Sequence, residues 1–215
     1  MKSVLIIGMG RFGRHMAEKL QELKNEVLAV DEDEGRINLA LPYVTNAQIG
    51  DATNEEFLKS LGVKNFDICV VAVGDNFQSS LIITSLLKDN GARLVISRAS
   101  RDMQAKLLLR NGANEVVYPE KQQAVWAAVK YSSDNVFDYI PLTEEVSIYE
   151  TPVPAAWMGK TIAELKIRQK YDINIVAVRR GDEVISVPSA DYTFIGSEII
   201  FVLGQNKDVS RFTHF

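Results

Sequence analysis

The sequence predicts an α/β fold: a doubly wound parallel sheet, then a crossover helix, then a small α+β domain. Three observations predict it. Short apolar segments alternate with amphipathic ones over residues 2–118, a glycine-rich turn follows the first apolar segment, and the alternation stops after Pro119. Apolar strands that alternate with helices indicate a parallel sheet covered by helices on both faces.

Each strand of the first region is predicted from a short apolar run rich in β-branched residues. Each helix is predicted from apolar residues at helical spacing, such as Phe12, Met16 and Leu20, or from end signals such as Asn54 and Gly62. The predicted strands cover 3–8, 26–31, 46–51, 67–74, 93–99 and 114–118, and the predicted helices cover 11–24, 32–41, 54–62, 76–91 and 101–112.

A different pattern follows Pro119. Residues 120–140 are predicted to form one long helix with no strand after it. Beyond it we predict strands, a short helical piece and a hairpin at the "RRGD" of residues 179–182; these elements cover 146–153, 161–171, 173–188 and 197–204. We therefore expect a first domain over 1–119, a crossover linker over 120–140 and a second domain over 141–215.

The composition narrows the class of protein. The chain has 215 residues and a net charge of −4, which argues against nucleic acid as the main partner. Its one cysteine, Cys69, excludes an intrachain disulfide and lies in an apolar run. Met1 leads directly into a predicted strand, and no apolar run approaches the ~20 residues of a membrane span. We expect a cytoplasmic protein without direct membrane insertion.

The glycine-rich turn lies in the stretch "LIIGMGRFG", which places Gly8, Gly10 and Gly13 between a strand and a helix. Asp31 follows Gly13 by 18 positions, at the end of the next strand. This context is the fingerprint of a Rossmann-like dinucleotide site, in which the backbone approaches phosphate and the carboxylate binds ribose hydroxyls. The alternative is a tight turn that binds no ligand.

Arg11 favours one kind of nucleotide. A helix N-terminus is already positive, so an arginine there is poorly placed unless an anion binds beside it. A terminal di- or triphosphate carries more charge than the pyrophosphate of NAD, so Arg11 favours ATP or ADP while leaving NAD or NADH as the alternative. The ends of neighbouring strands should line the same crevice; the residues expected there are Asp51, Ala52, Gly74 and Arg98.

Catalytic groups are not evident in the sequence. The two histidines, His15 and His214, lie in the helix after the glycine turn and beside the last residue. Neither is placed like a catalytic base, and no cluster of ionisable groups has catalytic spacing. We therefore expect a nucleotide-binding regulator and no enzyme. The alternative is a small NAD-dependent oxidoreductase or an NAD-binding redox sensor.

The residues of 4–20, 26–38, 49–74 and 112–121 resemble the N-terminal domain of the RCK (regulator of potassium conductance, TrkA-N) family, and residues 158–204 resemble its C-terminal domain. The likeness is greatest to regulatory subunits of Ktr-type potassium uptake systems. It implies a gating subunit that forms a homodimer and an octameric ring on a Ktr- or Trk-type membrane channel subunit, peripheral to the inner face of the cell membrane.

The resemblance also implies site residues. Gly8, Gly10, Arg11, Phe12 and Gly13 match the nucleotide loop, with Arg11 near the terminal phosphate of ATP or ADP. Asp31 matches the ribose ligand, and Arg98 stands where the family usually has lysine. Glu120 matches a glutamate that helps hold a divalent cation or Na⁺ at the dimer interface.

A second ligand site is implied for the C-terminal domain, because some members of the family bind cyclic di-AMP between paired C-terminal domains. The residues that fall at the corresponding positions are Ile162, Arg168, Ile173, Asn174 and Pro188. They would supply an apolar wall, an arginine for phosphate and a polar group. Without the resemblance, the same stretch would be only a strand preceded by basic residues.

Overall fold

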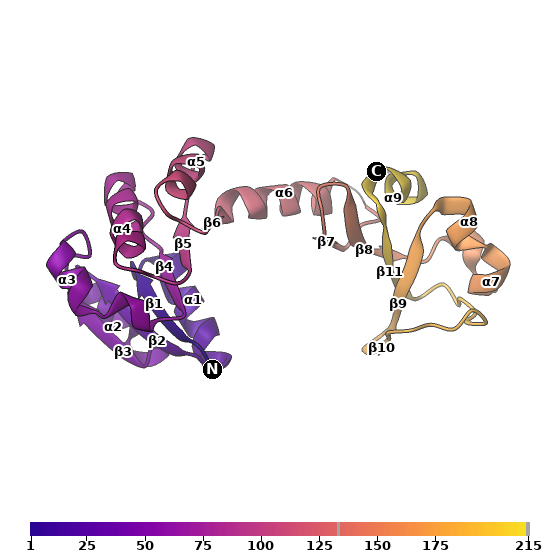
Figure 1. Cartoon of the computed structure of the whole chain (residues 1–215). Helices are drawn as coiled ribbons and strands as arrows, with labels where there is room; N and C mark the ends of the chain where they lie inside the picture. Colours follow the sequence, from indigo (N-terminus) through magenta and orange to yellow (C-terminus); the bar gives the residue numbers. More distant parts are fainter. Residues whose placement is uncertain (133, 214–215) are drawn as a thin grey trace. The chain divides into compact units, whose positions relative to one another are not determined.

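The computed structural model describes residues 1–132 and 134–213 and divides the chain into two compact units. The first unit contains Met1–Gln122, and the second begins at Gln123. Helix α6 (Pro119–Tyr131) spans the division between them (Figure 1).

The first unit is built on a parallel six-stranded sheet of order β3-β2-β1-β4-β5-β6. Its strands are β1 (Ser3–Ile7), β2 (Glu26–Asp31), β3 (Asn46–Ile49), β4 (Ile68–Val71), β5 (Val95–Arg98) and β6 (Glu115–Val117). The chain order reverses between β1 and β4, which is where doubly wound sheets bind ligands, outside the carboxyl ends of the strands. The predicted Rossmann-like fold class is confirmed.

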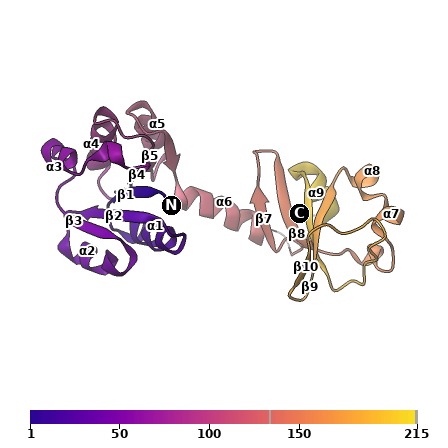
Figure 2. The ribbon, with the colours of Figure 1, turned by 60° about the horizontal axis from the view of Figure 1, so that its bottom comes forward.

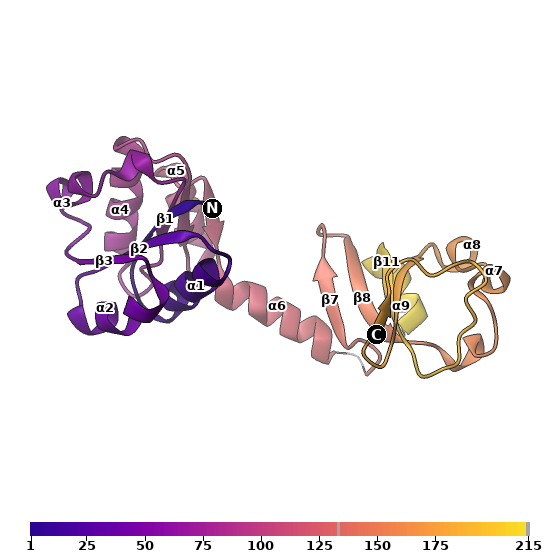
Figure 3. The same ribbon diagram turned by 90° about the horizontal axis from the view of Figure 1, so that it is seen from below.

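Helices cover both faces of this sheet (Figure 3). They are α1 (Arg11–Glu22), α2 (Glu34–Ala40), α3 (Glu55–Ser60), α4 (Phe77–Asp89) and α5 (Asp102–Arg110), with 3₁₀ turns at Leu41–Tyr43 and Val63–Asn65. On one face Ala17 and Ile37 of α1 and α2 pack with Val4. On the other, Leu58 and Leu87 of α3 and α4 pack with apolar side chains of β1, β2 and β4. The central strands β1 and β4 supply side chains to both cores, so their sequences are almost entirely apolar.

Side chains that cap helix N-termini fix where three of these helices begin. The side chain of Asp33 accepts a hydrogen bond from the Arg36 N–H at the start of α2. Asn54 caps α3 and Asn76 caps α4 in the same way. These caps occupy N–H groups that the first helical turn would otherwise leave without a partner.

The second unit contains a five-stranded antiparallel sheet of order β10-β9-β11-β8-β7 (Figure 2). Its strands are β7 (Asp138–Pro141), β8 (Val146–Pro152), β9 (Asn174–Arg180), β10 (Glu183–Ile185) and β11 (Ile199–Gln205). Its helices are α7 (Ile162–Leu165), α8 (Ile167–Tyr171) and α9 (Asn206–Thr213), with a 3₁₀ turn at Ala155–Trp157. The sheet and helices enclose a core that includes Trp157, Val178, Phe194, Ile200 and Val202.

The expected long helix over 120–140 is wrong in its second half. Helix α6 ends at Tyr131, and Asp138–Pro141 forms β7, which pairs with β8 and completes one edge of the second sheet. A strand of this length depends on its partner for stability, so local sequence alone does not reveal it. Helix α9 was also not predicted, and His214 lies outside the described residues. No helix in the described ranges is long and apolar enough to cross a membrane.

Candidate functional site

A cavity of about 690 Å³ opens at the carboxyl ends of the strands of the first unit. Its size suits a nucleotide, since ligand pockets of about 300–1,000 Å³ are usual. The sequence-predicted residues that line it are Gly8, Gly10, Arg11, Phe12, Asp31, Asp51, Ala52, Gly74, Arg98 and Glu120.

Two glycines of the turn meet different structural requirements, and the third meets none. Gly8 has φ +101°, a conformation that side chains disfavour. A Cβ on Gly13 would lie 2.0 Å from the Gly8 carbonyl oxygen, so Gly13 lets α1 pack against the turn. It does not line the cavity. Gly10, by contrast, has nothing within 4 Å of a Cβ position and faces open space.

Asp31 ties the ends of β1 and β2 together. Its Oδ2 accepts a hydrogen bond from the Met9 N–H at 2.6 Å, and its Oδ1 accepts one from the Asp33 N–H at 3.0 Å. The residue is only 6% exposed. A carboxylate has about four lone-pair positions, so it can still accept from a ribose hydroxyl while it holds the turn.

Arg11 is exposed at the start of α1 and makes no hydrogen bond or ion pair with a described residue. Helix α1 has no acidic residue in its first turn, and Gly10 offers no side-chain cap. Free N–H groups, the helix dipole and an unpaired guanidinium therefore meet at one point. This arrangement favours an anion.

Arg98 lies opposite, at the end of β5. Its guanidinium bonds the Glu120 carboxylate and lies 5.7 Å from the centroid of the Phe12 ring. A Cβ on Gly74 would lie 2.4 Å from Arg98 Nη1, so a side chain at this position would displace the guanidinium. The buried Arg98 Nε has no hydrogen-bond partner among the described residues. The site thus holds a second cation with an unused donor.

Glu120 begins α6 at the same edge of the cavity. Its own backbone N–H, and after it the guanidinium of Arg98, lower the pKa of its carboxyl below the ordinary value. The side chain is half exposed. Within the two described ranges, no three His, Cys, Asp or Glu side chains gather closely enough to bind a metal. A cation at Glu120 would need oxygen ligands from a nucleotide or a second chain.

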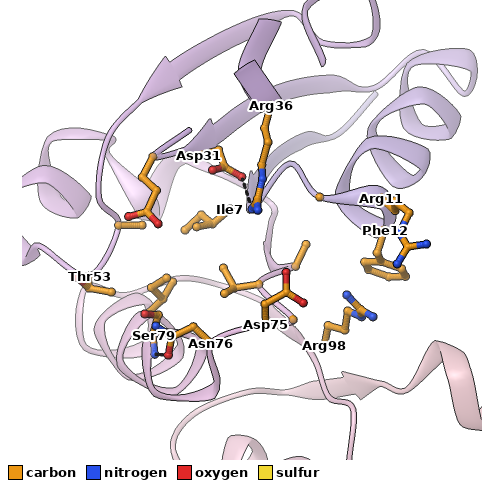
Figure 4. Close-up of a pocket in the computed structure, with 18 of the residues that line it drawn as sticks. Ile7, Arg11, Phe12, Asp31, Arg36, Thr53, Asp75, Asn76, Ser79 and Arg98 are labelled. Atoms are coloured by element: carbon orange, nitrogen blue, oxygen red, sulfur yellow. Dashed lines mark hydrogen bonds and ion pairs between the residues drawn. The ribbon is translucent and has the colours of Figure 1, made fainter. Parts of the chain in front are cut away.

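Sequence reasoning missed several lining residues. They are Arg36, Thr53, Asp75, Asn76 and Ser79 (Figure 4), and also Glu32 and His15. Most of them lie within five residues of a strand end, which is the signal that could have found them, whereas Ser79 and His15 lie further on, in α4 and α1. His15 is exposed and lies 3.8 Å from Glu18, a neighbour on its own helix.

The second unit has a smaller cavity of about 320 Å³ between α7, α8 and β9. Ile162, Arg168, Ile173 and Pro188 line it, as do Lys166 and Gln169. Asn174, the remaining predicted residue, is not part of its wall.

These features define a class: a Rossmann-like unit with a cavity of nucleotide size, followed by an α+β unit with a cavity of its own. Two family models match the chain. The model described as the TrkA-N domain matches residues 4–119, and the model described as the TrkA-C domain matches residues 146–215.

The Ktr system potassium uptake protein C of Bacillus subtilis (strain 168) is 41% identical over 98% of this chain and 96% of its own. The Ktr system potassium uptake protein A of the same strain is 35% identical over 98% and 95%. The crystal structure of the GsuK RCK domain has a TM-score of 0.69 at 18% identity, over 99% of this chain and 47% of that one, and shows the same fold. The chain belongs to the RCK (TrkA-N and TrkA-C) family that includes the Ktr potassium uptake proteins, and the predicted resemblance is confirmed.

Proposed function

We propose that the chain is the regulatory, gating subunit of a potassium uptake system, in which an adenine nucleotide bound in the first unit controls potassium flux through a separate membrane protein. The observation that carries this proposal is the pair of arginines at the cavity, Arg11 within the glycine turn and Arg98 at the end of β5. Arg11 has no bonded partner among the described residues, and Arg98 has an unused donor, in a cavity with a buried ribose-type carboxylate. The relatives named as potassium uptake proteins support the transport role.

ATP and ADP are the proposed ligands. Their terminal phosphates would lie between the N-terminus of α1 and Arg98, and Asp31 would bind the ribose. NAD or NADH is the alternative, because the same turn suits a pyrophosphate. A divalent cation or Na⁺ would bind Glu120 together with phosphate oxygens, which are ligands that hard cations prefer.

The remaining parts of the proposal concern the assembly. The nucleotide site would belong to the domain over 1–119 together with Glu120, and residues 141–215 would bind a second ligand, cyclic di-AMP, in the smaller cavity. Two chains would dimerise and then form an octameric ring on a Ktr- or Trk-type membrane subunit, at the cytoplasmic face. A ligand shifts such an assembly only by its differential affinity for the two states.

The experiment measures Arg11→Ala with ATP and with ADP by calorimetry, together with potassium flux in vesicles that carry the membrane subunit. If Arg11 binds the terminal phosphate, the variant should lose ATP affinity more than ADP affinity, by about 1–3 kcal/mol. ATP-driven activation of flux should also be lost while docking persists. Arg14→Ala is the matched control, because Arg14 is the other arginine of α1 and does not line the cavity. An Arg11→Ala chain that keeps its preference for ATP would contradict the role of Arg11.

An oxidoreductase is the second candidate, on the observation that the cavity matches a dinucleotide fingerprint. A turnover assay with NADH and titration with NADH and ATP distinguish the two. NADH oxidation at a measurable rate, or NADH binding far tighter than ATP, would favour the oxidoreductase or redox sensor.

A further inference from the structure

Arg36 is a cationic residue that lines the larger cavity, and no family pattern used above gives it a role. It lies in the first turn of α2, and its guanidinium reaches back toward the end of β2. Its Nη1 lies 3.8 Å from Asp31 Oδ2, and its Nε lies 3.7 Å from Asp33 Oδ2. Both separations exceed hydrogen-bond length, and the side chain is 49% exposed. The guanidinium is therefore held by ion pairs with the two carboxylates, and the exposed half of the side chain leaves it accessible to a ligand.

The order of the strands decides which end of a ligand Arg36 meets. The sheet runs β3-β2-β1-β4-β5, so the ends of β2 and β3 lie on one side of the glycine turn and the ends of β4 and β5 on the other. Figure 4 shows the same separation, with Arg36 beside Asp31 and with Arg11, Phe12 and Arg98 grouped apart from them. A nucleotide whose ribose lies at Asp31 and whose phosphates lie at Arg11 would place its base next to Arg36.

The base needs a flat partner at that end. Among the described residues, the cavity's aromatic side chains are Phe12 and His15, and both lie on α1. The Phe12 ring already faces Arg98. The end of β3 contributes Ala52 and Thr53, which are small. A guanidinium stacks on aromatic faces, whereas an ammonium is a compact point charge, so an arginine here is not equivalent to a lysine.

We propose that Arg36 determines recognition of the nucleoside end: its guanidinium plane covers the purine base of the bound nucleotide, while its charge offsets that of Asp31. This inference rests on the proposed function, because it requires a nucleotide in the cavity. It assigns the base to Arg36 and the phosphates to Arg11 and Arg98.

The test titrates the full chain with ATP and with inorganic tripolyphosphate, which has the phosphates and no base. The variants are Arg36→Ala, Arg36→Lys and Arg110→Ala; Arg110 is an exposed arginine of α5 outside the cavity lining and serves as the charge-matched control. We expect Arg36→Ala to weaken ATP about tenfold and to leave tripolyphosphate within about twofold. Arg36→Lys should recover less than half of the ATP affinity that Arg36→Ala loses, when both changes are expressed as logarithms of the dissociation constant. Arg110→Ala should bind both ligands as the parent does.

Different outcomes overturn different statements. ATP binding unchanged in Arg36→Ala, or fully restored in Arg36→Lys, would overturn the stacking role and leave the proposed function intact. Equal weakening of ATP and tripolyphosphate would reduce Arg36 to a general electrostatic contribution and would also overturn it. A parent chain that binds no ATP would overturn the proposed function itself, and the inference with it. Thermal melts of each variant confirm that the chain is folded during the titration.

Discussion

The Asp31 carboxylate accepts a hydrogen bond from the Met9 N–H at 2.6 Å, so the last residue of β2 holds the glycine turn that follows β1. The same carboxylate is the ribose ligand in the proposed function. If the ribose binds there, one buried side chain would serve both the shape of the turn and its ligand. Binding and stability should respond together when it is changed.

Asp31→Ala should weaken ATP, ADP and NADH by similar amounts, about 2–4 kcal/mol, because the ribose is common to all three. It should also lower the free energy of unfolding of the first unit by about 1–3 kcal/mol, since the Met9 and Asp33 N–H groups lose their acceptor. Calorimetric titration and urea unfolding measure the two effects. Glu34→Gln, an exposed carboxylate on α2, is the control. Unchanged titration curves would remove Asp31 from the ligand site.

Alanine substitutions at Gly13 and Gly10 should separate an effect on packing from an effect on nucleotide binding. A methyl group on Gly13 would collide with the Gly8 carbonyl oxygen, so Gly13→Ala should destabilise the first unit by about 1–3 kcal/mol or more. The methyl group of Gly10→Ala meets no neighbour, so the free energy of unfolding of this variant should lie within about 0.5 kcal/mol of that of the parent. Because Gly10 lines the cavity, its variant should lose nucleotide affinity while it stays folded. Circular dichroism melts check the first statement; equal stability of the two variants would contradict it.

Glu198 is a buried carboxylate of the second unit, and its side chain is fully covered. Burial by itself raises the pKa of Glu198. The N–H groups of Ile195, Glu198 and Gly196 and the Tyr192 hydroxyl act against burial and hold that pKa below its ordinary value. Because the pKa of Glu198 is lower in the folded chain than in the unfolded chain, the carboxylate stabilises the fold at pH values above the ordinary glutamate pKa of about 4.3. That stabilisation is lost as the pH falls through the pKa of the folded state.

Glu198→Gln should therefore lower the free energy of unfolding of the second unit by about 2–4 kcal/mol at pH 7. The side-chain amide of glutamine has a single acceptor oxygen for the surrounding N–H groups, whereas the carboxylate has two. The difference from the parent should shrink as pH falls from about 5 to 3. Both tryptophans of the sequence, Trp126 and Trp157, lie in the second unit, so urea titrations followed by tryptophan fluorescence report on that unit alone. Glu183→Gln, at an exposed position, is the control. A difference that is the same at pH 7 and pH 3.5 would show that the charge of Glu198 contributes nothing.

Arg168→Ala should reduce cyclic di-AMP binding and leave ATP binding intact, because Arg168 lines the smaller cavity and the nucleotide cavity belongs to the first unit. Lys170→Ala is the matched control on the same helix, since Lys170 lies near the Tyr171 ring and does not line the cavity. Calorimetry with both ligands makes the comparison. Absence of binding by the parent would remove the second site, and joint loss of both ligands would mean that the variant is misfolded.

The sequence by itself determined the parts that depend on neighbouring residues. Apolar periodicity predicts the six parallel strands, and the spacing of Gly8, Gly10 and Gly13 predicts a turn that approaches phosphate. Asp31 was predictable because the strand after such a turn ends a nearly fixed number of residues later. These features are local: the side-chain period and the glycine conformations are set within a few residues.

The tertiary structure alone decided which distant residues meet. The strand order carries Arg36 to one side of the glycine turn and Arg98 to the other, and no local pattern encodes that order. Strand β7 exists because β8 supplies its hydrogen-bond partners, and Asn174 stays off the wall of the smaller cavity although Ile173 beside it lines it. Adjacent residues of a strand point to opposite faces, so membership of a site depends on which face the sheet presents to it. Long-range pairing sets that face, and it becomes known only when the chain is folded.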